Sequence, residues 1–147
     1  MRLHHTGLSV PDLDRSLAWY CATFGFTPGF AFEVPQAQLR GAFAVGPNGV
    51  AIELIERAGS LPGPLPADPP QANELHGYNH IALAVGDLDE AYRHVVAAGA
   101  RPVWNPRASP EPGVRMAYVA DPDGNLIELI EDREENENQN DDEERAA

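Results

Sequence analysis

The 147-residue chain has few of the features that mark membrane, secreted or nucleic-acid-binding proteins. It contains no lysine and only ten arginines against 23 acidic residues, so no basic face for a phosphate backbone is expected. No apolar run approaches the roughly 18 residues of a membrane-spanning helix, and the N-terminus lacks an apolar signal region. A single cysteine, Cys21, excludes an intramolecular disulfide. We therefore expect a cytoplasmic protein that binds neither nucleic acid nor a membrane.

The acidic charge is concentrated at the C-terminus. The formal net charge of the chain is −13, and residues 132–147 carry −6 of it, from eight acidic side chains and two arginines. This segment has almost no apolar side chains, so it cannot bury surface on folding. We predict a disordered, solubilising tail over residues 132–147.

The chain before this tail contains an internal repeat. The segment GVAIELIE contains Glu53 and its near copy GNLIELIE contains Glu128, and 128 − 53 = 75. The segments HTGLSV and HIALAV begin at His5 and His80, which are also separated by 75 residues. A duplication therefore supplies two histidines and two glutamates at equivalent positions, all of them potential metal ligands.

Hydrophobic periodicity predicts the same β-α-β-β-β order in both halves, and hence an α+β fold. Asp12 and Asp87 are expected to cap the two helices, and Gly25 to end the first. The expected strands are 5–10, 26–34, 39–45 and 50–57, then 79–85, 101–105, 115–120 and 125–131; the helices are 13–24 and 87–98. The expected domains are a first module (1–58), a Pro-rich linker without regular structure (59–77) and a second module (78–131), in which the loop 106–113 covers the mouth of a site.

Strand alternation places each repeated histidine beside small residues and each repeated glutamate on an apolar strand face. A carboxylate in that position is costly unless it is paired, hydrogen-bonded or metal-bound. Two imidazoles and two carboxylates suit Zn, Ni, Co, Mn or Fe(II). The alternative is that the histidines are core or interface residues whose ring nitrogens are hydrogen-bonded, and that the glutamates are exposed. Glu56 and Glu131 point to the other face of the strand from Glu53 and Glu128 and are expected to be solvated. His4 is expected at the surface.

These motifs resemble those of the vicinal oxygen chelate superfamily, which includes glyoxalase I, methylmalonyl-CoA epimerase, extradiol dioxygenases and bleomycin-binding proteins. The resemblance covers residues 3–131 and rests on both His segments and on the run DPDGNLIEL. It implies two β-α-β-β-β modules that form an open barrel-like mixed sheet around one divalent metal ion. By matching positions, the ligands are His5, Glu53, His80 and Glu128. It also implies a homodimer, because such modules often complete their sites across a two-fold interface.

The resemblance implies a metal-dependent isomerase or lyase that acts on a small oxygenated substrate. Glu128, or Glu53, would move a proton beside an oxygen polarised by the metal. Two alternatives remain open: a non-haem Fe(II) dioxygenase, and a resistance protein of the bleomycin-binding type that sequesters an aromatic ligand with Trp19 and Trp104.

The candidate substrate-binding residues differ from those of glyoxalase I. Ser9 occupies the position where glyoxalase I has a basic residue that helps to bind glutathione, and Arg57 replaces an expected asparagine. Arg40 and Arg115 lie on strands expected to line the cleft. We expect these two arginines to bind a carboxylate or phosphate of the substrate, although surface positions would explain them as well.

Overall fold

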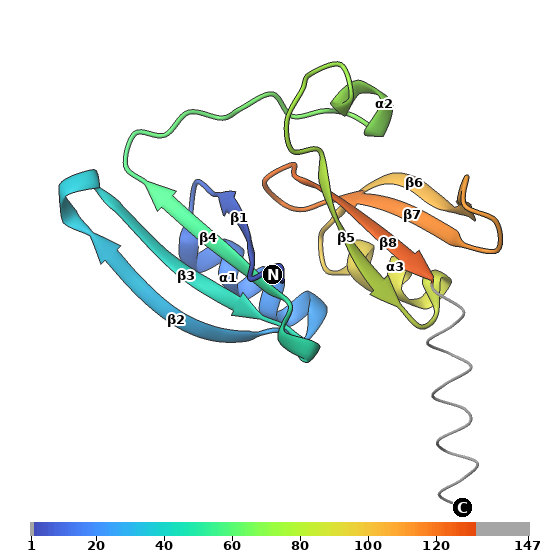
Figure 1. The fold of residues 1–147 in the computed structure, drawn as a ribbon, viewed down its shortest axis with the longest axis horizontal. Coiled ribbons are helices and arrows are strands. Elements are labelled where there is room, and N and C mark those ends of the chain that lie inside the picture. Colours follow the sequence, from blue (N-terminus) through green and yellow to red (C-terminus); the bar gives the residue numbers. More distant parts are fainter. Residues whose placement is uncertain (1, 132–147) are drawn as a thin grey trace, which may run out of the picture. The chain divides into compact units, whose positions relative to one another are not determined.

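The computed structural model describes residues 2–131, so the predicted acidic tail lies outside the described residues (Figure 1). None of the helices in this part of the chain is long and apolar enough to cross a membrane. The elements in chain order are β1 (Thr6–Ser9), α1 (Leu13–Phe24), β2 (Thr27–Val34), a 3-10 turn (Pro35–Ala37), β3 (Leu39–Val45), a second 3-10 turn (Pro47–Gly49), β4 (Ala51–Arg57), α2 (Pro69–Ala72), β5 (His80–Val85), α3 (Leu88–Ala97), β6 (Arg101–Ala108), β7 (Arg115–Ala120) and β8 (Leu126–Glu131).

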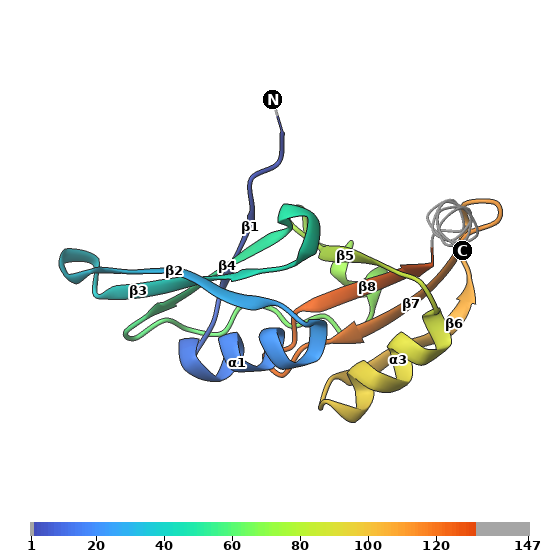
Figure 2. The same cartoon turned by 90° about the horizontal axis from the view of Figure 1, so that it is seen from below.

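Contacts between residues divide the chain into two units, Met1–Leu65 and Pro66–Ala147, and the boundary falls within the segment predicted as a linker. In the first unit the strand order is β1-β4-β3-β2. β1 runs parallel to β4, and the other neighbouring strands are antiparallel. α1 packs against one face of this sheet, chiefly on β3 and β4 (Figure 2). The opposite face of the sheet is not covered by α1, and we call it the open face.

The second unit repeats this arrangement element by element. Its strand order is β5-β8-β7-β6, with β5 parallel to β8 and the remaining neighbours antiparallel. α3 covers one face of the sheet and contacts β6, β7 and β8 (Figure 2). The α+β class and both β-α-β-β-β modules are thus confirmed, as two four-stranded sheets. Their arrangement around a common metal ion remains a prediction.

Both long helices begin where the sequence predicts. The Asp12 carboxylate accepts a hydrogen bond from the Arg15 backbone N–H at 3.0 Å, and Asp87 accepts one from the Glu90 N–H at 2.8 Å. These side chains satisfy backbone donors that a helix start leaves without partners. Gly25 ends α1 in the left-handed conformation, with φ at 66°.

The core of each unit lies between its helix and the helix-facing side of its sheet. Ile52 and Leu54 of β4 are fully buried there, as are Ile127 and Leu129 of β8. Because side chains alternate along a strand, the residues between these apolar pairs must face away from the helix. This alternation places the central residue of β4 and of β8 on the open face of each sheet.

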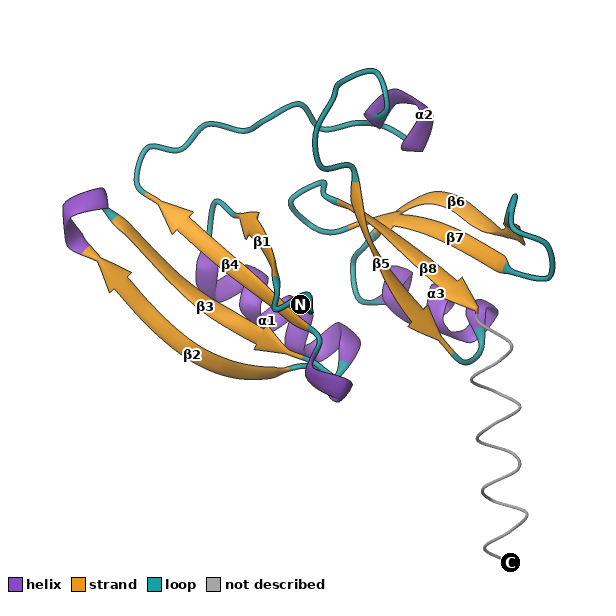
Figure 3. Ribbon diagram, viewed as in Figure 1, coloured by secondary structure: helices purple, strands orange, loops and turns teal. Residues whose placement is uncertain are grey.

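Two segments differ from the sequence expectation. The predicted irregular linker contains the single-turn helix α2 (Figure 3), because Asp68 accepts from the Gln71 N–H at 2.9 Å and proline suits the first helical position. The strand expected to end at residue 105 continues to Ala108. β6 is an edge strand with two register shifts against β7, and such bulged edges tolerate Pro106.

Candidate metal centre

The first His–Glu pair lies on the face of its sheet opposite to α1. His5 directly precedes β1, and Glu53 lies in the middle of β4, across the parallel ladder from Gly7. His5 Nε2 lies 3.4 Å from Glu53 Oε2, and their side chains are 34% and 19% exposed. A Cβ at Gly7 would lie 3.6 Å from Glu53 Oε2, so only a very small residue leaves this carboxylate uncovered. The pair is therefore partly buried but accessible.

The second pair repeats this geometry in the other unit. His80 begins β5, and Glu128 lies in the middle of β8, across from Ala82. His80 Nε2 lies 3.0 Å from Glu128 Oε2, and the side chains are 29% and 13% exposed. The structure thus brings together the two members of each predicted pair.

The distance within each pair suits two neighbouring ligands of one metal ion. Metal–nitrogen and metal–oxygen bonds of about 2.0–2.2 Å, meeting at tetrahedral or octahedral angles, separate the two donor atoms by about 2.9–3.5 Å. The observed 3.4 and 3.0 Å both fall in this range. No cluster of three or more His, Cys, Asp or Glu ligands occurs among residues 2–131, where each unit contributes one pair.

A neighbouring side chain orients each of the two histidines. His4 Nδ1 lies 2.7 Å from His5 Nδ1, and Asn79 Oδ1 lies 2.8 Å from His80 Nδ1. His4 and Asn79 are equivalent in the repeat, since 79 − 4 = 75, although His4 was expected to be only a surface residue. The Asn79 amide is itself fixed, because its Nδ2 donates to Asn73 Oδ1 at 2.9 Å.

The contact with Asn79 determines what the other ring nitrogen does. Because Asn79 Oδ1 can only accept, the proton of a neutral His80 ring is on Nδ1, and Nε2 presents its lone pair. A lone pair and a carboxylate oxygen at 3.0 Å repel each other unless a proton or a metal ion lies between them. The geometry of the pair therefore fits a bound cation.

An aromatic ring lies beside each His–Glu pair. Phe43 contacts the His5 ring at 5.2 Å between centroids, and Tyr118 contacts the His80 ring at the same distance. These residues are again equivalent, since 118 − 43 = 75. The Tyr118 hydroxyl lies 3.3 Å from His80 Nε2. Burial, followed by the charge of Glu128 and a hydrogen bond to it, raises the pKa of the Tyr118 phenol, which therefore stays protonated at neutral pH.

In each unit a row of side chains runs from this aromatic ring across the sheet, and the two units differ in the residues that form the row. In the first unit Phe43, Phe32 and Phe30 follow one another at 6.4 and 6.2 Å between ring centroids, and Phe30 is 73% exposed. We call these three residues the phenylalanine strip. In the second unit the corresponding row is Tyr118, Trp104 and Arg107, which we call the cationic strip.

The sequence matches a model of the Glyoxalase/Bleomycin resistance protein/Dioxygenase superfamily over residues 2–129. The chain belongs to this superfamily. It is 34% identical over 137 residues to the lactoylglutathione lyase of Salmonella typhimurium, covering 89% of this chain and 93% of the relative. It is 31% identical over 135 residues to a probable lactoylglutathione lyase of Synechocystis, covering 89% and 95%.

Solved structures of glyoxalases have the same fold. Glyoxalase I from Leishmania major, described as trypanothione-dependent, is 28% identical and aligns with a TM-score of 0.68, covering 100% of this chain and 99% of that one. Glyoxalase I from Zea mays is 25% identical with a TM-score of 0.72 over 89% of this chain, which spans only 44% of the maize protein.

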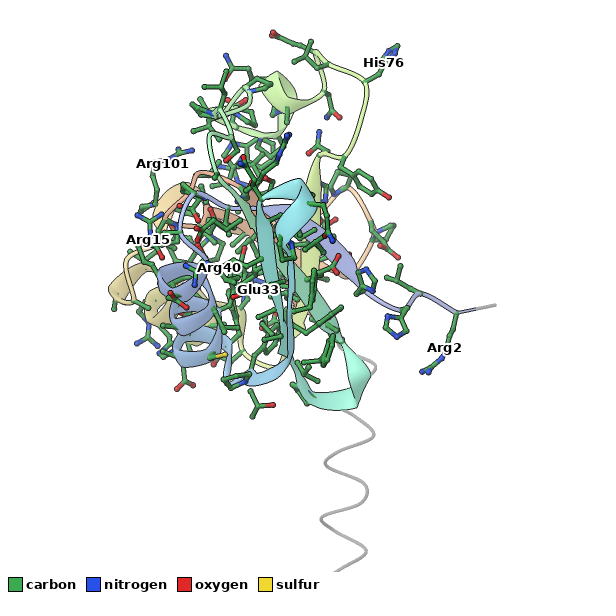
Figure 4. All side chains as sticks on the ribbon, turned by 90° about the vertical axis from the view of Figure 1, so that its left-hand side faces the viewer. Arg2, Arg15, Glu33, Arg40, His76 and Arg101 are labelled. Atoms are coloured by element: carbon green, nitrogen blue, oxygen red, sulfur yellow. The ribbon has the colours of Figure 1, made fainter. Side chains whose placement is uncertain are left out.

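In this glyoxalase-superfamily chain, the two candidate substrate-binding arginines lie on the helix side of each sheet. Arg40, which is labelled in Figure 4, is opposite Glu56 in the β3–β4 ladder. Its guanidinium lies 2.9 Å from Glu56 and 3.0 Å from Asp14 of α1. Arg115 is held in the same way, 3.2 Å from Glu131 and 2.8 Å from Asp89. The structure does not bring either arginine to the His–Glu face.

The expectation that Glu56 and Glu131 are merely solvated is wrong. Glu56 Oε2 accepts from the Leu13 backbone N–H at 2.7 Å, and Glu131 Oε1 accepts from the Leu88 N–H at 3.1 Å. A carboxylate is favoured at the positive end of a helix. Hydrogen bonds from the Arg40 side chain and then from Leu13 lower the pKa of Glu56. Both glutamates therefore fasten a helix to the strand that carries a candidate ligand.

The two tryptophans considered for binding an aromatic ligand have different surroundings. Trp19 lies in α1 and packs edge-on against Tyr20 and Phe24, on the helix side of its sheet. Trp104 lies on the His80 side of the second sheet, 5.5 Å from the Tyr118 ring. Of the two, Trp104 is the one placed on a face that carries a candidate ligand.

Proposed function

We propose that this protein is a metal-dependent lyase or isomerase of the glyoxalase type. The observation that carries the proposal is the repetition of a His–Glu pair, at 3.4 and 3.0 Å, on the open face of both sheets. Membership of the superfamily and the lactoylglutathione lyases among the relatives support the same reaction class.

The proposed metal site uses His5, Glu53, His80 and Glu128. Two neutral imidazoles and two carboxylates together carry a charge of −2, which balances a divalent ion such as Zn, Ni, Co, Mn or Fe(II). The two pairs would bind one ion, either within one chain or with the modules of a second copy. A homodimer and a cytoplasmic location remain predictions from the sequence.

The proposed reaction moves one proton between adjacent carbons of a small oxygenated substrate. In the reaction of a lactoylglutathione lyase, the hemithioacetal of glutathione and methylglyoxal becomes a thioester. The carbon attached to sulfur loses its C–H proton and the proton of its hydroxyl group, while the neighbouring carbonyl carbon and its oxygen each gain one proton, with no net oxidation. When bound, the metal ion polarises the substrate oxygens and so lowers the cost of removing that proton.

Glu128 is the proposed proton carrier, with Glu53 as the equivalent candidate in the other unit. The Glu128 carboxylate is 13% exposed, so substrate would exclude most of the water around it. Tyr118 adds a protonated hydroxyl beside the same pair, which fixes the position of the His80 ring. These roles require the carboxylate to accept the proton from one carbon and return it to the next.

The test is metal content and turnover, measured on protein purified without an affinity tag. We expect about one divalent ion per proposed site in the wild type and its loss in the His5→Ala/Glu128→Ala double variant. Glu128→Gln and His80→Ala should each abolish turnover of the methylglyoxal–glutathione hemithioacetal. His76→Ala, at an exposed histidine labelled in Figure 4, is the matched control and should retain both metal and activity.

The outcome also separates the two alternatives. Bound iron together with a strict requirement for O2 would favour the dioxygenase. Protein that binds no metal after reconstitution, but binds an aromatic ligand tightly in the presence of chelator, would favour the sequestering protein. Full turnover by both Glu128→Gln and His80→Ala would contradict the proposed mechanism.

A further inference from the structure

The segment before β5, predicted as part of a linker without regular structure, is tied to the second unit by its own hydrogen bonds. The contacts between residues place it in that unit from Pro66 onward. Arg101, at the start of β6, donates to the backbone oxygens of Pro66 and Ala67 at 3.4 and 3.3 Å. Pro69, the first residue of α2, is buried. This part of the chain is therefore docked on the unit that carries His80 (Figure 1).

The single turn α2 is closed at both ends. The Asp68 carboxylate accepts from the Gln71 backbone N–H at 2.9 Å, and the Gln71 side-chain oxygen accepts in return from the Ala67 N–H at 2.6 Å. This reciprocal pair resembles a capping box. At the other end the Asn73 backbone N–H donates to the Pro69 oxygen at 3.1 Å. The backbone of Asn73 is therefore held in place, and its side chain starts from a fixed point.

The Asn79 amide lies between Asn73 and the candidate ligand His80. Its Nδ2 donates to Asn73 Oδ1 at 2.9 Å, and its Oδ1 lies 2.8 Å from His80 Nδ1. An amide can rotate by 180°, which exchanges its donor and acceptor ends. The rotated amide would aim a donor at His80 Nδ1, which could accept only with the ring proton on Nε2, the atom that faces Glu128. The acceptor at Asn73 therefore favours the amide orientation that leaves His80 Nε2 free to bind a metal ion.

We propose that Asn73 is a positioning residue for the metal ligand His80 and that it acts through the Asn79 amide. This deepens the proposed function and rests on it, because it takes His80 as a ligand. The segment between the two modules is then part of the support of the metal site, in addition to joining the modules.

The first unit does not have this support within residues 2–131. His4 occupies the position equivalent to Asn79, and there the only hydrogen-bond partner of its side chain is His5, at 2.7 Å. Positioning from α2 is therefore a property of the second unit. The signals of the His5 ring serve as an internal control in the same sample.

The position of the ring proton tests the proposal without metal. Long-range 15N–1H NMR spectra of apoprotein, at a pH where the rings are neutral, distinguish histidine rings protonated on Nδ1 from those protonated on Nε2. The His80→Ala variant assigns the His80 signals. We expect Asn73→Ala to lower the ratio of the Nδ1–H to the Nε2–H form of His80 by about three- to tenfold, the effect of losing one hydrogen bond. Asn73→Asp keeps an acceptor for Asn79 and should retain the wild-type ratio.

Zinc affinity, measured against a chelator of known affinity, provides a double-variant cycle. Asn73→Ala should weaken zinc binding by about three- to tenfold in the wild type, and Asn73→Asp should restore it. In an Asn79→Ala background Asn73→Ala should have no further effect, because its only route to His80 has been removed. The matched control is Asn105→Ala, which removes a 2.8 Å hydrogen bond from the Tyr92 hydroxyl and should change neither readout.

The proposal is overturned if Asn73→Ala leaves the proton ratio of His80 unchanged, or if the wild-type ring is protonated on Nε2 alone. It is also overturned if Asn73→Ala weakens zinc binding equally with and without Asn79, which a merely structural role would produce. Failure of the proposed function looks different. It would give protein without turnover or zinc binding in which the proton ratio of His80 still depends on Asn73 and on Asn79.

Discussion

The backbone N–H of Leu13 donates a 2.7 Å hydrogen bond to Glu56, which joins the start of α1 to the strand that carries Glu53. Arg40 contacts the same carboxylate at 2.9 Å and extends the junction to Asp14. The second unit builds the same junction 75 residues later. Each candidate metal-binding glutamate thus lies three residues before a carboxylate that anchors a helix.

Glu56→Gln should destabilise the protein at neutral pH by about 1 kcal/mol, because a neutral amide is a weaker partner for the helix start and for Arg40. The folded protein lowers the pKa of Glu56, so this contribution is complete above the unfolded value of about 4.3 and is lost as the pH falls through the lowered pKa. The measurement is urea denaturation of wild type and variant at pH 7 and pH 3. The difference should be smaller at the lower pH.

Glu74→Gln is the control for that comparison, because Glu74 is exposed and its side chain makes no hydrogen bond or ion pair with any of residues 2–131. It should leave stability unchanged at both pH values. A difference between wild type and Glu56→Gln that is as large at pH 3 as at pH 7, or that equals the effect of the control, would contradict the assigned role.

His4→Ala and Asn79→Ala should each weaken metal binding by about 10- to 100-fold, the usual effect of removing the partner that orients a ligand histidine. His4 and Asn79 hold the Nδ1 atoms of His5 and His80 at 2.7 and 2.8 Å. Titration of apoprotein against a chelator of known affinity gives the metal dissociation constant. His76→Ala again serves as control, and unchanged affinity in both test variants would show that the two contacts do not orient ligands.

Gly41→Ala should destabilise the first unit by about 1–3 kcal/mol, as overpacking does in a filled site. A Cβ at Gly41 would lie 2.5 Å from Phe32 Cζ and 3.1 Å from the backbone oxygen of Leu54, so the Phe32 ring would have to move. Gly7→Ala is the matched substitution in a roomier position, where the repeat already has Ala82. Equal denaturation midpoints for the two variants would rule out the steric argument.

Cys21 should react slowly with alkylating reagents at pH 7. Burial raises the pKa of its thiol, so the reactive thiolate is scarcer than in a free cysteine. The rate of reaction with iodoacetamide, followed by mass spectrometry across pH 6–10, gives the apparent pKa. It should exceed the value of about 8.5 for an ordinary cysteine, and a folded protein that reacts as fast as the urea-unfolded chain would disprove this.

Much of the architecture could be predicted from the sequence, because the repeat fixes two modules and strand alternation fixes their faces. Alternation predicted Glu53 on one face of its strand, and in the structure its neighbours Ile52 and Leu54 are buried on the opposite face. The turn α2 was missed although Asp68 followed by prolines is a helix-start signal, because the whole segment was treated as a linker.

The positions of some side chains could not be predicted, because they depend on local backbone and rotamer geometry that hydrophobic periodicity does not determine. The placement of Arg107 on the His80 face depends on a bulge that breaks the alternation from which faces are predicted. The contacts of His4 and Asn79 depend on the rotamers of adjacent side chains, which point to opposite faces in an ideal strand. The repeat itself held a usable signal, since both residues directly precede a candidate ligand.

The difference between the phenylalanine strip and the cationic strip means that the two halves of this duplicated chain are no longer interchangeable. A hybrid made of two copies of the second half would retain two histidines and two glutamates, and so all four candidate metal donors. It would, however, present a cation twice and the exposed aromatic ring of Phe30 nowhere. Duplication therefore preserved the candidate metal donors in both copies, while divergence along the rest of each sheet gave the two units different side chains beside those donors.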